Sequence, residues 1–254
     1  MTATIEQRRD GRRGQAVAVA VPVVSLGLVL TAILTVMLSV VGLALGLVLT
    51  VAVTVVRVRR FGTSTDRRIV DAFPTRPAAD VPVAAGFCNL VGGLGASVGV
   101  EVTDLRVLDD EGCNLLVVDD GRGSPAIMVT SGLLGAASRV ELEGVVARAL
   151  VQIRRGDAAA VVSELAMDRA PDVKVIRTLV GGSSILDDPD RDVLLDREAV
   201  GITRYPPGLA GALAACRRGT TRVAGADAAT APLWLADPSG QWPLDDRIEV
   251  LELL

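Results

Sequence analysis

The hydrophobic pattern divides the chain into one long uncharged run and a body in which apolar and polar residues alternate. The run covers residues 16–56, which include no charged side chain. One continuous helix over this run would be about 60 Å long, about twice the thickness of the hydrocarbon core of a bilayer. The run therefore predicts two membrane-spanning helices joined by a tight turn near residues 39–46.

Arginines flank this run on both sides. They are Arg8, Arg9, Arg12, Arg13, Arg57, Arg59 and Arg60. A signal peptide has an apolar core of about 7–15 residues, so the run is too long to be one. Because positive residues stay on the cytoplasmic side, we expect a cell-membrane protein that crosses the lipid bilayer twice, with both termini and the main domain in the cytoplasm.

The pattern predicts four segments. They are a basic cytoplasmic N-terminus over residues 1–15, a transmembrane helical hairpin over 16–56, a juxtamembrane linker over 57–80 and a cytoplasmic domain over 81–254. Within the domain, strand-like runs at 102–108, 114–118 and 126–130 follow one helical stretch at 81–100 and precede helices at 138–157, 192–202 and 207–217. A block of strands followed by a block of helices predicts an α+β fold.

The helix expected over residues 138–157 has the clearest signals. Ser138 and Glu141 match the capping box that starts a helix, and Gly156 can adopt the left-handed conformation that ends one. Apolar residues recur between them at helical spacing. We expect this helix to be buried in the domain.

The composition excludes several kinds of active site. The chain contains no histidine, the commonest metal ligand and the usual general base at neutral pH. Its absence excludes H-E-x-x-H zinc sites and Ser-His-Asp triads. Three cysteines, Cys88, Cys113 and Cys216, are odd in number and widely spaced, so no disulfide framework is expected.

The charge of the body argues against nucleic acid as a partner. Residues 1–60 carry seven basic and two acidic residues, whereas the rest of the chain carries 19 basic and 28 acidic residues, a net charge of −9. An acidic body has no electrostatic footprint for nucleic acid.

A G-x-S-x-G motif at residues 95–99 places Ser97 where a nucleophile elbow would have its serine. Its context is helical instead of strand-turn-helix, and no histidine is present to activate the hydroxyl. We therefore expect a structural role for these residues.

The order of the motifs in the domain resembles that of the HtpX-like family of membrane-anchored zinc metallopeptidases. The segments that carry the resemblance are 89–91, 127–134, 138–157, 191–199 and 243–248. The family's phrase at 141–147 leads directly into H-E-x-x-H. The resemblance implies a zincin-like, metallopeptidase-type domain after the membrane hairpin.

At the family's catalytic positions this chain has other residues. Arg148, Ala149 and Gln152 stand where the resemblance places the first histidine, the glutamate base and the second histidine. Asp192 stands at the third zinc ligand and Asp196 at a downstream aspartate, while Gln241 replaces a further histidine. These departures from the family's pattern predict no zinc, no other cofactor and no enzymatic activity.

Charge compensation offers a structural hypothesis. Arg148 would lie about where the metal sits, so a salt bridge to Asp192 or Asp196 would connect the two helices in place of zinc. The alternative is that Arg148 points into solvent, as most charged side chains do.

These observations predict a membrane-anchored pseudopeptidase that binds a membrane protein or polypeptide partner, as an adaptor or regulatory subunit of a membrane-associated complex. The partner would add to an edge strand at residues 126–130. Two alternatives remain: a membrane-bound metalloendopeptidase with non-standard metal ligands, and a structural membrane protein whose contacts lie in residues 16–56.

Overall fold

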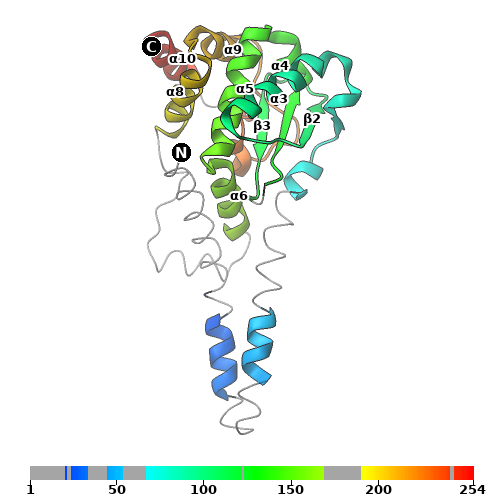
Figure 1. Cartoon of the computed structure of the whole chain (residues 1–254), viewed down its shortest axis with the longest axis vertical. Coiled ribbons are helices and arrows are strands. Elements are labelled where there is room, and N and C mark those ends of the chain that lie inside the picture. Colours follow the sequence, from blue (N-terminus) through cyan, green and yellow to red (C-terminus); the bar gives the residue numbers. More distant parts are fainter. Residues whose placement is uncertain are drawn as a thin grey trace. The chain divides into compact units, whose positions relative to one another are not determined.

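The computed structural model describes residues 21, 24–33, 45–53, 67–121, 123–168, 190–240 and 243–254 (Figure 1). The contacts divide the chain into two compact units. One comprises Met1–Thr65 and Ser163–Ser183, and the other comprises Asp66–Val162 and Ser184–Leu254. The second unit contains every strand and most of the helices described below, and it contains the candidate site.

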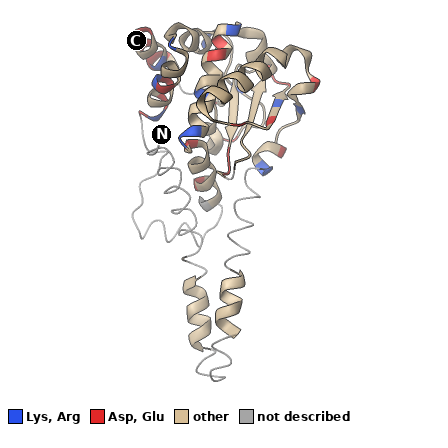
Figure 2. Cartoon of the chain, viewed as in Figure 1, with Lys and Arg blue, Asp and Glu red and all other residues tan. Residues whose placement is uncertain are grey.

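The first unit includes two helices, over residues 24–33 and 45–53, which contain no charged side chain (Figure 2). A Cβ added at Gly27 would lie 2.2 Å from Cγ2 of Thr50, so the glycine permits the two helices to approach closely. Among the described residues, no helix is both long and apolar enough to cross a bilayer. The predicted two-span hairpin is therefore not confirmed, and most of its expected turn lies outside the described residues.

The second unit is built on a four-stranded mixed sheet. The strands are β1 Thr75–Pro77, β2 Asp104–Leu108, β3 Leu115–Val118 and β4 Ala126–Thr130, in the order β1-β2-β4-β3. β2 and β4 run parallel, and the other two pairs are antiparallel. Every residue of β3 and β4 is buried, which is typical of strands covered on both faces.

The sheet order corrects the expected edge strand. Residues 126–130 form β4, which pairs with β2 on one side and with β3 on the other. β4 is therefore an inner strand, and the two outer strands of the sheet are β1 and β3. A partner cannot add to β4 because both of its backbone edges are already paired.

Helices make up most of the rest of this unit, so the fold is mixed α and β, as predicted. They are α3 Ala85–Val98, α4 Ser131–Ala136, α5 Arg139–Arg154, the first part of α6 Asp157–Asp168, α8 Arg191–Thr203, α9 Pro206–Arg218 and α10 Asp245–Glu252, with short 3-10 turns η1 Ala78–Asp80, η2 Pro82–Ala84 and η4 Ala228–Leu233. The helix expected over 81–100 is shorter, because two 3-10 turns precede it.

Helix α5 is the central helix, and α3, α8 and α9 pack around it. The expected capping box is present: the Glu141 N–H donates to Ser138 Oγ at 3.4 Å, and the Ser138 N–H donates to the Glu141 carboxylate at 2.6 Å. A Cβ at Gly144 would lie 2.7 Å from the backbone N of Leu209, so this glycine allows α9 to approach. Buried residues extend around the helix and include two polar side chains, Arg148 and Gln152.

The G-x-S-x-G motif lies on α3 and not on a strand-to-helix turn. The Ser97 hydroxyl donates to the carbonyl of Leu94 at 2.7 Å, within its own helix. Gly99 has a φ of +72° and ends the helix in the left-handed conformation. These residues therefore have the structural role expected from the sequence.

Candidate functional site

Six charged side chains gather where α5, α8 and α10 meet. We call them the arginine–aspartate cluster: Arg148, Arg191, Arg247, Asp157, Asp192 and Asp196. Three arginines and three aspartates give the cluster no net charge. This balance matters because a buried charge is tolerated only when it is paired and hydrogen-bonded.

Arg148 connects α5 to α8. Its side chain is only 2% exposed, and its Nε donates to Asp196 at 2.9 Å while one terminal nitrogen donates to Asp192 at 2.6 Å. The other terminal nitrogen lies 3.4 Å from the amide oxygen of Gln152, one helical turn away. Burial, followed by the neighbouring Arg247, lowers the pKa of Arg148, while both aspartates act in the opposite direction.

Asp196 is the buried centre of the cluster. Both of its oxygens accept hydrogen bonds from Arg247, at 2.7 and 2.9 Å, in addition to the bond from Arg148. Burial acts to lower the pKa of Arg247, but the carboxylates of Asp196 and Asp192 outweigh it and raise that pKa above its ordinary value. One carboxylate thus ties α8 to both α5 and α10.

Asp192 and Arg191 lie at the border of the cluster. The Asp192 side chain is 43% exposed, and besides Arg148 it faces Arg191 at 3.7 Å and Arg247 at 3.9 Å. Burial acts to raise the pKa of Asp192, but the three guanidinium groups together hold it below its ordinary value. Arg191 also pairs with Asp157, a carboxylate at the start of α6.

A segment near the C-terminus closes the site. We call residues 230–236 the strap; it starts in η4 and continues in extended conformation at Trp234. The Pro232 carbonyl accepts hydrogen bonds from Gln152 at 3.1 Å and from Arg191 at 2.7 Å. The Leu235 carbonyl accepts one from Arg247 at 2.6 Å. The strap therefore covers the cluster with its own backbone.

The residues singled out in the sequence come together only in part. Arg148, Gln152, Asp192 and Asp196 lie in one network, and Arg148 does not point into solvent. Ala149 is buried and brings no polar atom, and Gln241 lies outside the described residues.

Sequence reasoning missed three members of the cluster, Arg191, Arg247 and Asp157. The first two stand in motifs that carry the family resemblance, at 191–199 and 243–248, so their positions were visible. Their pairing was not visible, because the partners lie 34 and 51 residues apart in the chain.

The side chains at this centre do not fit a zinc ion of the kind the resemblance implies. Arg148 brings a permanent positive charge to the middle of the site, which repels a metal cation. The Gln152 amide oxygen faces Arg148, and its nitrogen is bonded to the strap. Within the part of the chain that the structure describes, no three His, Cys, Asp or Glu side chains are placed to hold a metal. The chemistry present here is ion pairing.

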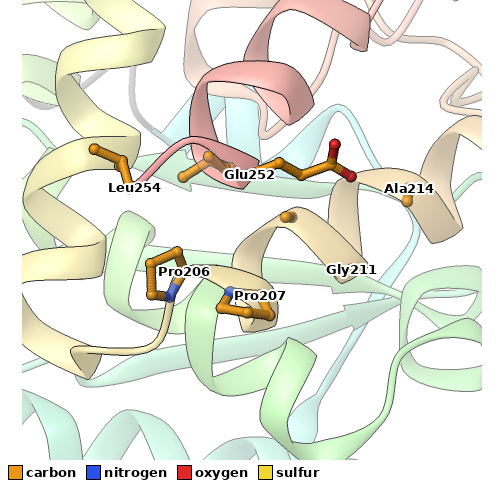
Figure 3. A pocket seen from close by; sticks show the side chains of 8 residues that line it. Pro206, Pro207, Gly211, Ala214, Glu252 and Leu254 are labelled. Atoms are coloured by element: carbon orange, nitrogen blue, oxygen red, sulfur yellow. The ribbon is translucent and has the colours of Figure 1, made fainter.

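A separate groove of about 560 Å³ lies between the start of α9 and the C-terminus. Figure 3 shows Pro206 and Pro207 on one side of it and Glu252 and Leu254 on the other. None of the cluster residues lines it, so the groove is not an entrance to the cluster.

Comparison with known proteins gives two similar sequences. The chain is 28% identical over 206 residues to a protein named Protease HtpX homolog from Dictyoglomus thermophilum, covering 65% of this chain and 68% of that protein. It is 26% identical over 207 residues to a protein of the same name from Dictyoglomus turgidum, with the same coverage of each chain. No family model and no solved structure matches the chain.

These names correct the expectation that the chain is not an enzyme. Both relatives are named as proteases, which points to a peptidase family. The expectation relied on single positions of the catalytic motif, whereas the similarity extends over about two thirds of the chain. The comparison supports a relation of this chain to the HtpX-like peptidases.

Proposed function

We propose that this relative of HtpX-like peptidases acts at a membrane by binding a polypeptide, as an adaptor or regulatory subunit of a membrane-associated complex. The observation that carries the proposal is that charged side chains and a segment of the chain itself fill the site. A charge-balanced cluster and the strap occupy the space between α5 and the edge of the sheet. Such a centre is suited to holding a binding surface in one conformation.

Membrane attachment is supported by the sequence of residues 16–56. This uncharged run with arginines at both ends fits a two-helix anchor with both termini and the domain in the cytoplasm. The close approach of the helices at Gly27 agrees with such an anchor, because small residues permit helices to pack closely in lipid.

The partner would bind at a surface of the second unit other than β4. The two outer strands differ in what they offer. β1 has three residues and ends in Pro77, which lacks the N–H that a ladder needs. β3 is longer, and a strand paired with its outer side would lie beside α5, α8 and α10.

Proteolysis is the second candidate function, and the printed names of the relatives favour it. Casein cleavage by the purified full chain distinguishes the two candidates. Cleavage that is lost in Asp192→Ala, at the resemblance's third-ligand position, would assign the activity to this site. Cleavage that persists in that variant would not depend on this site.

Affinity purification of the full chain from membranes after crosslinking tests the binding proposal. We expect one or a few proteins to be captured at a constant ratio, and their capture to need residues 81–254. Capture that is unchanged when residues 81–254 are deleted would contradict the proposal and assign the contacts to residues 16–56.

A further inference from the structure

The strap makes the contacts of an added β-strand. β3 is the last strand of the sheet, and its outer side faces the strap. Trp234 forms an antiparallel bridge with Leu116, and the Leu235 N–H donates to the carbonyl of Leu115 at 2.8 Å. Strand addition uses this kind of main-chain pairing.

Asn114, just before β3, extends the pairing by one residue. Its side-chain NH₂ donates to the Ala236 carbonyl at 2.8 Å, and its side-chain oxygen accepts from the Ala236 N–H at 3.2 Å. The Asn114 side-chain amide thus bonds both the N–H and the C=O of Ala236, as a backbone partner in a β-ladder would. The chain itself thus occupies the outer edge of β3 at Leu115 and Leu116.

On its other side the strap is held by three buried donors. Gln152 and Arg191 bind the Pro232 carbonyl, and Arg247 binds the Leu235 carbonyl. All of these bonds go to backbone oxygens, so they would accept many sequences. Main-chain bonds give affinity in this mode of recognition, and side-chain pockets give specificity.

The specific contact comes from Trp234. Its side chain is 2% exposed, its ring packs edge-on against Phe73 with centroids 5.5 Å apart, and its indole N–H donates to the Thr230 hydroxyl at 3.2 Å. Residues 228–236 carry no charge. The place beside β3 that Trp234 fills therefore suits an uncharged segment with one bulky aromatic side chain.

Two glycines bound the segment that contains the strap. Gly225 has a φ of +76° and Gly240 a φ of +71°, a conformation that glycine adopts without strain. Such positions absorb large backbone changes at low cost, and hinges use a few loop residues of this kind. Release of the strap would therefore turn the backbone at these two glycines.

We propose that the strap is an internal occupant of a polypeptide groove along β3, and that a partner binds there by replacing it. The partner segment is uncharged, extended beside Leu115 and Leu116, and carries an aromatic side chain at the place of Trp234. This inference rests on the proposed function, because it requires a polypeptide partner. It adds that binding is controlled by release of the strap.

A peptide with the sequence of residues 228–240 is the probe for the groove. Labelled and titrated with the purified full chain in detergent, it should bind Trp234→Ala at least about tenfold more tightly than the unmodified chain, because the variant holds its own strap less firmly. The same peptide with alanine in place of the tryptophan is the matched control and should not bind. Equal binding to both proteins, or no binding to a variant with an unchanged circular dichroism spectrum, would overturn the proposal.

Hydrogen exchange on the unmodified chain provides a test that needs no variant. If the strap opens on its own, the backbone amides of Leu235 and Ala236 exchange earlier than the buried amides of α5. The α5 amides exchange only when the whole domain unfolds. Exchange of both groups at the same rate would contradict release of the strap. Partner capture that is unchanged when residues 81–254 are deleted would instead contradict the proposed function, so the two failures are distinguishable.

Discussion

Replacing Arg148 with methionine should destabilise the second unit strongly. Methionine keeps much of the apolar volume but removes the cation that lies 2.9 Å from Asp196 and 2.6 Å from Asp192. Removal of one partner of a buried ion pair costs about 3–5 kcal/mol. Arg247 continues to pair with Asp196, so we expect a loss near the lower end, about 3 kcal/mol.

The free energy of unfolding is measured by denaturant titration of the full chain in detergent, followed by circular dichroism. Arg217→Met is the matched control, since Arg217 pairs with Asp245 at 2.5 Å but the two side chains are 49% and 62% exposed. An exposed pair contributes about 0–1 kcal/mol. Equal losses in the two variants would refute the view that the cluster stabilises the fold.

A double-mutant cycle separates ion pairing from packing. Asp196→Asn is measured alone and together with Arg148→Met, and residues in one such network typically show an interaction energy of about 0.5–3 kcal/mol. An interaction energy of zero would mean that Arg148 contributes only through its apolar atoms.

Three further predictions concern acid stability, helix packing and capping. The pKa of Asp192 is lower in the folded chain than in the unfolded chain, so its carboxylate contributes stability that is complete above about pH 4 and is lost as the pH falls through the folded pKa. Asp192→Asn should therefore lose less stability than the unmodified chain between about pH 5 and pH 3. An equal loss in the two proteins would contradict this. Gly144→Ala should cost about 1–3 kcal/mol in the same denaturant assay, since its Cβ would meet the backbone of Leu209, whereas Gly86→Ala, with open space around the added Cβ, should be neutral or stabilising. Ser138→Ala should cost about 1 kcal/mol by removing the cap of α5, and no loss would mean that the cap is dispensable.

Local features of the fold were predictable from the sequence. The start of α5 follows from Ser138 and Glu141, because a capping box involves only four consecutive residues. Helices α8 and α9 differ from their predicted ranges by one residue at each end, since their apolar periodicity is clear.

Features that depend on distant parts of the chain were not predictable. The expectation of an edge strand at 126–130 was wrong because strand order is a property of the whole sheet: β2 pairs in parallel with β4, which leaves β3 outside. The strap gave no signal either, since residues 230–236 show no strand pattern of their own. The residues that bond their backbone are scattered along the chain, and Asn114 lies 122 residues before Ala236.

The prediction that Arg148 pairs with Asp192 or Asp196 came from the family resemblance, which aligns the helices that carry these residues. Helical periodicity alone would have placed a charged side chain in solvent. The cluster also includes Arg247 and Arg191, whose bonds to Asp196 and Asp157 join residues 51 and 34 positions apart in the chain.

We infer that the arginine–aspartate cluster, and not a metal, holds α5, α8 and α10 together. Zinc analysis and thermal unfolding of the purified full chain, each with and without EDTA, test it most directly. The structure predicts no stoichiometric zinc and the same unfolding midpoint in both conditions, with a clear drop in the midpoint for Arg148→Met. One zinc ion per chain, whose removal by EDTA lowers the midpoint, would contradict the claim.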